Sequence, residues 1–291
     1  MRYRVGKVTL PYLYLLSATI LLVGLLVLPF ISGIAMSLQS MKLSGEVKWV
    51  GLGNFLMLFR ESRFATDVRN SLFYILGNIL LSTPFAYGAA LLISSKFKQA
   101  FVFRGIFLLP WIIAPVVSTV LFRTMVDPAM GPVAKMLSTM AGKQIIILSN
   151  ANLALITVIV HSFWRSFPFI MLFLAAGMAS IPDELYESAV VDGANGWKRF
   201  IHITVPLTSN QLGLSLLMVT IWTLHDAETI YAFTQGGPGY STETLAVRLF
   251  KMSFINFDLN MGSTIGVILI LISLVFMFFY LKLSIGKDME K

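Results

Sequence analysis

Long blocks of apolar residues, separated by shorter polar stretches, constrain this 291-residue chain more than any other feature of its sequence. A helix that crosses a bilayer needs about 20 mostly apolar residues to span a hydrocarbon core of about 30 Å. Several blocks reach that length, and 57% of the residues are hydrophobic while only 12% are charged. This composition argues against a soluble fold and predicts an all-α membrane protein.

Six blocks are long enough to form membrane-spanning helices. They cover residues 11–38, 70–94, 105–126, 151–178, 205–233 and 262–283. The first is longer than the apolar part of a signal peptide, which has about 7–15 residues, so we expect a retained helix and not a cleaved leader. Prolines inside several blocks remove a backbone donor and kink a helix, which suits either a transport pathway or ordinary bundle packing. These prolines are Pro29, Pro84, Pro110, Pro115 and Pro168.

Basic residues at the ends of the blocks predict the orientation in the membrane. Lysine and arginine concentrate in short cytoplasmic segments, so we expect both termini and the loops before the third and fifth blocks to be cytoplasmic. The residues in these segments are Arg2, Arg4, Lys7, Lys96, Lys98, Arg104, Lys198, Arg199, Lys282, Lys287 and Lys291. Topology and lipid contact explain the net charge of +8 without nucleic acid. The lack of cysteine excludes disulfides, thiolate metal sites and cysteine nucleophiles.

The loop between the fourth and fifth blocks has the pattern of a short helical hairpin. Pro182 suits the first turn of a helix, and Asp183 and Glu184 complement the positive end of its dipole. Gly193 and Asn195-Gly196 stop that helix and turn the chain. The pattern predicts a helix–turn–helix on the cytoplasmic surface, with small residues at the turn that another protein's backbone could approach closely.

The same loop resembles the EAA signature of binding-protein-dependent ABC importer permeases. That signature is Glu-Ala-Ala, three residues, Gly, nine residues, Ile, one residue and Leu-Pro. The equivalent residues here have the same spacing, with Ser188 in place of Ala and Val205 in place of Leu: Glu187-Ser188-Ala189, Gly193, Ile203 and Val205-Pro206. A motif of this kind predicts a function only in the right structural context, which here is a cytoplasmic loop between two spans.

The resemblance implies that this loop is a coupling helix. In the family it docks in a cleft of the ATPase subunit and passes the closure of the nucleotide-binding dimer to the spans. Glu187 would then pair with a basic group of the ATPase, and Gly193 would permit the tight turn. The alternative is an amphipathic interfacial helix that has no partner. The residues assigned to ATPase coupling are Glu187, Ser188, Ala189, Asp192, Gly193 and Ala194.

Three further stretches resemble the sugar permeases of this family. They are Trp49–Phe55 in the first outer loop, Trp164–Phe169 in the fourth block, and Thr234–Gly239 with Thr242–Thr244 after the fifth. The last set is typical of the subunit similar to the maltose-system F-type and the glycerol-phosphate A-type permease. The implied fold is that of a type I ABC importer permease with six transmembrane helices. We expect an N-terminal span and outer loop over 1–69, a transmembrane core over 70–283 that contains the coupling loop 179–206, and a cytoplasmic tail over 284–291.

The resemblance also implies a non-catalytic transport subunit that carries a sugar or a related polar solute. Its implied partners are a second, different permease, two ATPase subunits and an extracellular or periplasmic solute-binding protein. It would be a multi-pass protein of a bacterial or archaeal plasma (inner) membrane. The chain has no GxxxxGK[ST] phosphate loop, so we expect ATP and Mg²⁺ to bind the partner ATPase, and we expect no cofactor and no metal in this chain.

Polar residues in the fourth and fifth blocks are the candidates for the solute pathway. Ionisable groups inside a span are costly and usually face a cavity or a partner. The candidates in these blocks are His161, Arg165, His225, Asp226 and Glu228. The solute-facing positions of the family correspond here to Ser162, Arg165, Ser166, Phe169, Val219, Thr223 and Asp226. The family has polar residues where this chain has Phe169 and Val219. Arg165 could contact solute or form an ion pair with Asp226, and the sequence favours neither.

Two other function classes fit the sequence less well. An ion-coupled secondary transporter would need no docking element for an ATPase, and it is expected to contain inverted repeats, of which the sequence shows no clear sign. A membrane enzyme is disfavoured because neither HExxH nor GxSxG occurs. The sequence therefore favours the ABC permease, with the secondary transporter as the alternative.

Overall fold

The computed structural model describes residues 15–16, 18–41, 46–94 and 100–288, with only the backbone for Met41 and 283–288. The chain forms two compact units, Met1–Glu61 with Leu249–Ile268, and Ser62–Arg248 with Leu269–Lys291, called unit 1 and unit 2 below. Several predicted features lie outside the described residues. These are the start of the first span at residue 11 and the basic residues Arg2, Arg4, Lys7, Lys96, Lys98 and Lys291.

Unit 1 contains the first span and a small hairpin. The π-helical turn η1 (Val23–Val27) leads directly into α2 (Leu28–Ser37), and the strands β1 (Gln39–Met41) and β2 (Val47–Trp49) pair antiparallel. The helix α3 (Gly53–Arg60) follows. Near its start the amide of Asn54 donates to the carbonyl oxygens of Ser37 and Gln39, at 2.9 and 2.8 Å. This explains the Asn of the Trp49–Phe55 stretch as the residue that ties α3 to the end of the first span.

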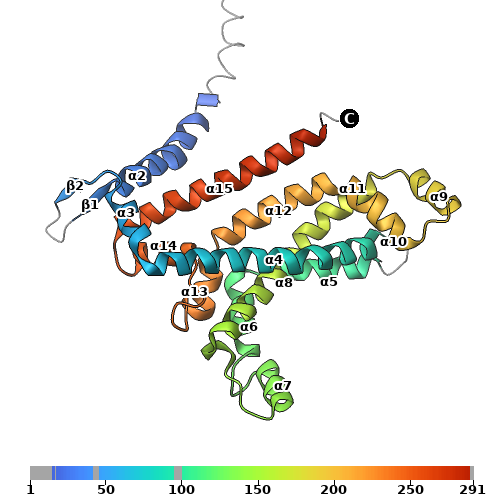
Figure 1. The fold of residues 1–291 in the computed structure, drawn as a ribbon, viewed down its shortest axis with the longest axis horizontal. Coiled ribbons are helices and arrows are strands. Elements are labelled where there is room, and N and C mark those ends of the chain that lie inside the picture. The colour runs from blue at the N-terminus through green and yellow to red at the C-terminus, as the bar shows by residue number, and fades with distance from the viewer. Residues whose placement is uncertain (1–14, 17, 42–45, 95–99, 289–291) are drawn as a thin grey trace, which may run out of the picture. The chain divides into compact units, whose positions relative to one another are not determined.

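Unit 2 is built around two long helices. Helix α4 (Ser62–Ser94) packs along α8 (Ala151–Ala179), and both contact α5 (Ala100–Ile112) and α12 (Ser209–Leu224) (Figure 1). Gly77 makes the close approach of α4 and α8 possible, because a Cβ there would lie 2.8 Å from Cγ2 of Ile159. Apolar side chains of α4, α8 and α12 form the main core of this unit.

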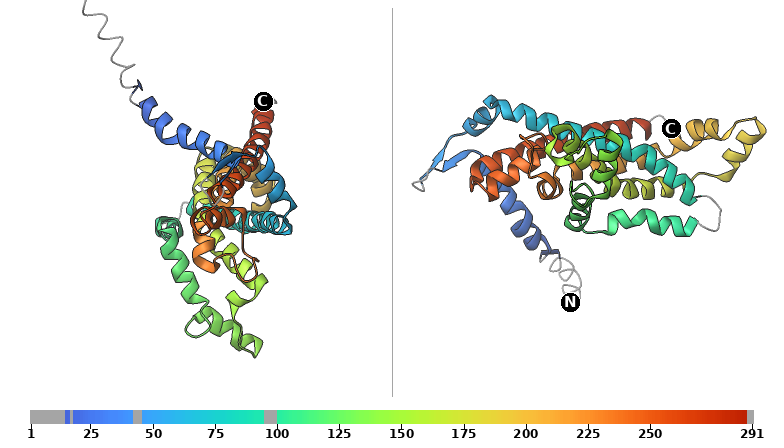
Figure 2. Two further views of the ribbon diagram at one scale, coloured as in Figure 1. Left: turned by 90° about the vertical axis from the view of Figure 1, so that its left-hand side faces the viewer. Right: turned by 90° about the horizontal axis from the view of Figure 1, so that it is seen from below.

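Shorter elements complete unit 2 at both ends of α12. At one end lie α6 (Pro115–Met125), α7 (Pro132–Ala141), the 3₁₀ turn η2 (Ile147–Ser149) and α13 (Glu228–Thr234). At the other end lie α9 (Asp183–Val191), α10 (Gly196–Arg199), the π-helical turn η3 (Phe200–Thr204) and α11 (Val205–Leu207). Figure 2 shows α9 and α10, in yellow, at the opposite end of this unit from the orange α13. The last helices are α14 (Leu245–Phe254) and α15 (Leu259–Asp288).

The predicted spans agree with the structure in part. Among the described residues, four helices are long and apolar enough to cross a membrane, at Ala18–Ser37, Ser62–Ser94, Ala151–Ala179 and Leu259–Lys282, and the pair α5 and α6 would make a fifth. This pair bends by 96°, so the predicted span 105–126 is not one straight helix; Pro115 begins its second half. The predicted span 205–233 is likewise divided into α11, α12 and α13. Helix α12 has 16 residues and a length of about 24 Å. The count of six continuous spans therefore stays a prediction.

Candidate solute cavity and coupling hairpin

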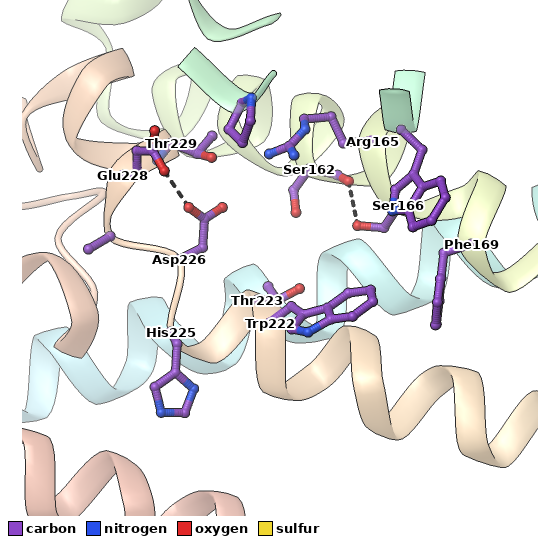
Figure 3. Close-up of a pocket in the computed structure, with 13 residues that line it drawn as sticks. Ser162, Arg165, Ser166, Phe169, Trp222, Thr223, His225, Asp226, Glu228 and Thr229 are labelled. Carbon is purple, nitrogen blue, oxygen red and sulfur yellow. Dashed lines mark hydrogen bonds between the residues drawn. The ribbon is translucent and has the colours of Figure 1, made fainter. Parts of the chain in front are cut away.

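An open cavity of about 440 Å³ lies between α8 and the end of α12, and we call it the solute cavity (Figure 3). It has the size of ordinary small-molecule sites. Its lining includes six of the seven residues predicted for the pathway: Ser162, Arg165, Ser166, Phe169, Thr223 and Asp226. The structure therefore brings together residues that lie as much as 64 positions apart in the sequence.

Val219 is the predicted pathway residue that does not line this cavity. Its side chain is 1% exposed and belongs to the core formed with α4 and α8. It lies one turn before Thr223 on α12, and a valine at this position gains more from burial against apolar neighbours than from contact with a polar solute. The structure thus gives Val219 a packing role.

A second layer on α4 holds the polar lining in place. The amide of Asn78, which is fully buried, donates to Oγ of Ser166 at 3.1 Å and to Oγ1 of Thr223 at 2.9 Å. Its own oxygen accepts from Ser82 at 2.7 Å. One side chain therefore links α4, α8 and α12 and fixes the hydroxyls that face the cavity.

Asp226 is held by partners other than Arg165. Its Oδ2 accepts from the hydroxyl of Tyr74 at 2.9 Å and its Oδ1 accepts from the backbone N–H of Thr229 at 3.0 Å. Within the part of the chain that the structure describes, no ion pair joins Arg165 to Asp226. The Nε of Arg165 is buried and has no hydrogen-bond partner among those residues. In Figure 3 the Arg165 side chain extends into the space that Ser162 and Asp226 also face.

Aromatic side chains form part of the wall of the solute cavity. Trp111, Phe169 and Trp222 line it, and the rings of Phe169 and Trp222 meet at a centroid distance of 4.6 Å. Phe169 also contacts Phe173, one turn further along α8, at 4.7 Å. The cavity therefore combines hydroxyl and guanidinium groups with aromatic faces.

The two histidines of the predicted fourth and fifth spans, His161 and His225, lie in different surroundings. His161 is fully buried, its Nε2 lies 3.0 Å from Oγ of Ser118, and its ring packs against Phe122 and Phe233. It does not line the solute cavity. His225 does line it, but its ring is turned away from Asp226 and its Nδ1 lies 2.9 Å from the carbonyl oxygen of Ile221 (Figure 3).

Sequence reasoning missed the residues of the second layer and part of the aromatic wall. These are Tyr74, Asn78, Trp111, Trp222 and Thr229. A signal for two of them exists on α4, where polar residues recur every fourth position, at Asn70, Tyr74, Asn78 and Ser82. This spacing puts them on one helix face. The two tryptophans carry no comparable signal, because tryptophan is also common where a helix meets the membrane surface.

The predicted helix–turn–helix is present between α8 and α12, and we call residues 181–204 the coupling hairpin. Asp183 and Glu184 occupy the first turn of α9, and Gly193 ends the helix with φ at +77°. The N–H of Ala194 donates to the carbonyl oxygen of Ala189 at 2.8 Å, which closes the turn as glycine-terminated helices do. Asn195 then starts α10, because its side chain accepts from the N–H of Lys198 at 2.9 Å.

The side chains assigned to ATPase coupling lie together on this hairpin. Glu187, Ser188, Asp192 and Gly193 are exposed, and Ala189 and Ala194 are half-buried. On the inner side the hydroxyls of Tyr186 and Thr204 lie 3.0 Å apart and join α9 to η3. The turn of the hairpin and the Glu187 side of α9 are therefore exposed, and the Tyr186–Thr204 contact supports the opposite side.

The Thr234–Thr244 loop and the start of α14 are fastened to the start of α4 by charged groups. Arg248 donates to Asp67 at 2.8 Å, and both side chains are buried. Arg63 pairs with the buried Glu243 and lies 3.6 Å above the ring of Tyr240. The charges of these two positive and two negative side chains are therefore paired, and the pairs hold the loop and the start of α14 against α4.

These features define a membrane-spanning transport subunit: long apolar helices, a polar and aromatic cavity between two of them, and a braced surface hairpin. The family described as binding-protein-dependent transport system inner membrane component matches residues 4–285. The chain belongs to this family, and it is a permease subunit of an ABC importer. This decides against the ion-coupled secondary transporter that the sequence had left as the alternative.

Individual relatives are similar over most of the chain. The trehalose/maltose transport system permease protein of Thermococcus litoralis is 30% identical over 98% of this chain and 96% of that protein. The sn-glycerol-3-phosphate transport system permease protein of Rhizobium meliloti is 32% identical over 78% and 77%. A solved bacterial alginate ABC transporter, in complex with an alginate pentasaccharide-bound periplasmic protein, contains a chain with a TM-score of 0.83 at 22% identity, over 96% of this chain and 94% of that one. The last similarity supports the type I importer permease fold.

Proposed function

We propose that this permease carries a sugar or a related polyhydroxylated solute through the solute cavity. The observation that carries the proposal is the lining of that cavity. Hydroxyl groups of Ser162, Ser166 and Thr223 and the guanidinium of Arg165 can exchange hydrogen bonds with solute hydroxyls. Aromatic faces of Trp111 and Trp222 can pack against the C–H faces of a sugar ring. The names of relatives that transport trehalose, maltose and alginate support the same solute class.

The energy for transport would come from a separate ATPase that docks on the coupling hairpin. Glu187 would pair with a basic side chain of that ATPase, and the small residues Gly193 and Ala194 would let its backbone approach. In this proposal the hairpin and both termini are cytoplasmic, and ATP and Mg²⁺ bind the ATPase. The assembly would comprise this chain, a second and different permease, two ATPase subunits and a solute-binding protein on the outer side.

The assembly and its solute can be tested in one preparation. The chain is purified from membranes of its host with a tag, co-purifying subunits are identified, and ATPase activity is measured in proteoliposomes with the cognate binding protein. The panel of added solutes contains maltose, trehalose, glycerol, sn-glycerol-3-phosphate and an alginate oligosaccharide. We expect an ATPase and a second permease in the preparation, and hydrolysis that one or a few polyhydroxylated solutes stimulate.

Two results would contradict the proposal. One is solute uptake by this chain alone in the absence of any ATPase. The other is an assembly whose hydrolysis responds only to amino acids, peptides or inorganic ions tested beside the sugars.

A further inference from the structure

A second cavity lies between the same two helices, closer to the coupling hairpin. Its volume is about 480 Å³, and we call it the hairpin-side cavity. Its lining comes from α8, α12 and α15: Leu172, Phe173, Ala176, Asn210, Gln211, Leu214 and Tyr280. From Arg165 in the solute cavity to Ala176 in this one, α8 rises by about 16 Å.

One buried polar group of the hairpin-side cavity has no hydrogen-bond partner among the described residues. The amide oxygen of Gln211 is buried and accepts no hydrogen bond from the residues that the structure describes. Gly177 leaves room for this amide, because a Cβ there would lie 3.0 Å from Cγ and Cδ of Gln211. Asn210 is exposed one residue earlier. Amide groups on an open helix face gain nothing from lipid tails, which offer no hydrogen bonds.

The two cavities are separated by aromatic rings. Phe169 lines the solute cavity and Phe173 lines the hairpin-side cavity, and their ring centroids are 4.7 Å apart. Trp222 from α12 contacts Phe169 at 4.6 Å. We call these three side chains the aromatic partition.

The chemistry of the hairpin-side cavity fits a neutral solute. Among the described residues that line it, none carries a charge. Asn210 and Gln211 offer amide donors and acceptors, and Phe173 and Tyr280 offer aromatic faces. This set repeats the combination of hydrogen-bonding groups and rings found in the solute cavity.

We propose that the hairpin-side cavity is a second binding site for the same polyhydroxylated solute, reached past the aromatic partition on the way to the cytoplasm. The inference rests on the proposed function, because it takes the solute class and the direction from it. Gln211 and Asn210 bind solute hydroxyls there, and Phe173 and Tyr280 pack against the sugar ring.

The absence of cysteine in this chain allows a direct test by site-specific labelling. Single variants Asn210→Cys and Ala176→Cys report on the hairpin-side cavity, and Ser166→Cys reports on the solute cavity. Leu271→Cys is the control on a helix face that is 55% exposed and apolar. Each variant is expressed with its complete transporter, and inside-out membrane vesicles are treated with a charged methanethiosulfonate reagent. Labelling of this chain is measured with and without the sugar that stimulates the wild-type ATPase in the panel above.

The expected result is labelling of Asn210→Cys and Ala176→Cys that the sugar slows. At a sugar concentration of about ten times Kd, the free fraction of a site falls about tenfold, and so should the labelling rate. Leu271→Cys should not react, whether or not sugar is present.

The remaining outcomes separate this inference from the proposed function. If sugar protects Ser166→Cys and leaves Asn210→Cys and Ala176→Cys unprotected, the second site is disproved and the proposed function stands. If Asn210→Cys and Ala176→Cys are as unreactive as Leu271→Cys, lipid or the second permease covers the hairpin-side cavity, and the inference fails. If sugar protects none of the variants, the proposed solute pathway fails as well.

Discussion

Asp226 and Arg165 face the same cavity, yet no ion pair joins them in the part of the chain that the structure describes. The carboxylate of Asp226 is fixed by the Tyr74 hydroxyl and the Thr229 N–H, so each oxygen already accepts a hydrogen bond. Of the two roles that the sequence left open for Arg165, the ion pair with Asp226 is not seen among the described residues. Contact of Arg165 with solute stays a prediction.

Exchanging the two charges tests this assignment. We expect Arg165→Asp and Asp226→Arg each to reduce uptake, and the double variant to recover none of the loss. The reason is that an arginine at position 226 cannot accept the hydrogen bonds from Tyr74 and Thr229, and each buried donor left unsatisfied costs about 1–3 kcal/mol. Uptake of labelled sugar, normalised to the amount of inserted protein, is the measurement. Recovery to near the wild-type rate in the double variant would restore the ion-pair interpretation.

Glu187 and Glu184 form a matched pair on the exposed surface of α9. We expect Glu187→Gln to reduce solute uptake more than about tenfold while ATP is still hydrolysed, since losing one partner of a buried interfacial charge pair costs about 2–5 kcal/mol. Glu184→Gln, one turn earlier, should leave uptake close to that of the wild type. Both activities are measured on the same proteoliposomes. Equal uptake by the two variants would remove Glu187 from the coupling contact.

At the scale of elements, proline positions explain several departures from straight helices. The π-helical turns η1 and η3 each end two residues before a proline, Pro29 and Pro206. A proline lacks the N–H and its ring crowds the carbonyl four residues earlier, so the preceding turn widens to keep its remaining bonds. Pro115 acts differently, since it opens α6 after the 96° bend. A proline can therefore begin a helix, widen the preceding turn or kink a helix, and the sequence alone does not predict which of these occurs.

The contact between α4 and α8 depends on a missing side chain. We expect Gly77→Ala to lower stability by about 1–3 kcal/mol, because the added Cβ overlaps Ile159 in a packed interface. Gly88→Ala on the same helix has nothing within 4 Å of the added Cβ, and it should be neutral or slightly stabilising. Thermal unfolding of the purified protein in detergent compares the two. If both variants unfold at the same temperature, the tight approach at Gly77 is not important for stability.

The buried pair of Asp67 and Arg248 fastens the start of α14 to the start of α4. We expect Arg248→Met to destabilise the protein by about 3–5 kcal/mol, because it leaves the Asp67 carboxylate buried without its counter-charge. The double variant Asp67→Leu, Arg248→Met should regain most of this loss, since apolar residues of similar volume can replace a buried pair. Unfolding temperatures of the single and double variants give the answer. A double variant no more stable than Arg248→Met would show that the pair is not the source of the effect.

For the whole molecule, the sequence predicted best what depends on local spacing. The coupling hairpin follows from Pro182, the acidic first turn and Gly193, all within a dozen residues. The cavity lining on α8 followed from resemblance and helical periodicity. The roles of Tyr74 and Asn78 could not be predicted, because they depend on which face of α4 meets α8 and α12, and that packing is a long-range property. The burial of Val219 on α12 has the same origin, and so does the division of the predicted span 205–233 into α11, α12 and α13.

The proposed orientation makes a prediction for the whole chain. Ser188 on the coupling hairpin and Met140 at the end of α7 are both exposed. We expect Met140→Cys to react with a membrane-impermeant maleimide in intact cells, and Ser188→Cys to react only in inside-out vesicles, because the positive-inside rule places the hairpin loop in the cytoplasm. The natural chain, which contains no cysteine, supplies the background. Reaction of Ser188→Cys in intact cells would reverse the orientation and remove the hairpin from contact with a cytoplasmic ATPase.

Helix α8 runs without interruption from the solute cavity towards the coupling hairpin. Its 29 residues extend for about 44 Å, from beyond the solute cavity to Ala179, two residues before the coupling hairpin. Pro168, which removes one hydrogen bond from this rod, sits between Ser166 and Phe169 of the cavity wall. A force applied at the hairpin and transmitted along α8 would therefore act on a helix whose missing hydrogen bond lies at the solute cavity. The contacts of α8 with the solute would then change before either end of the helix had to unfold.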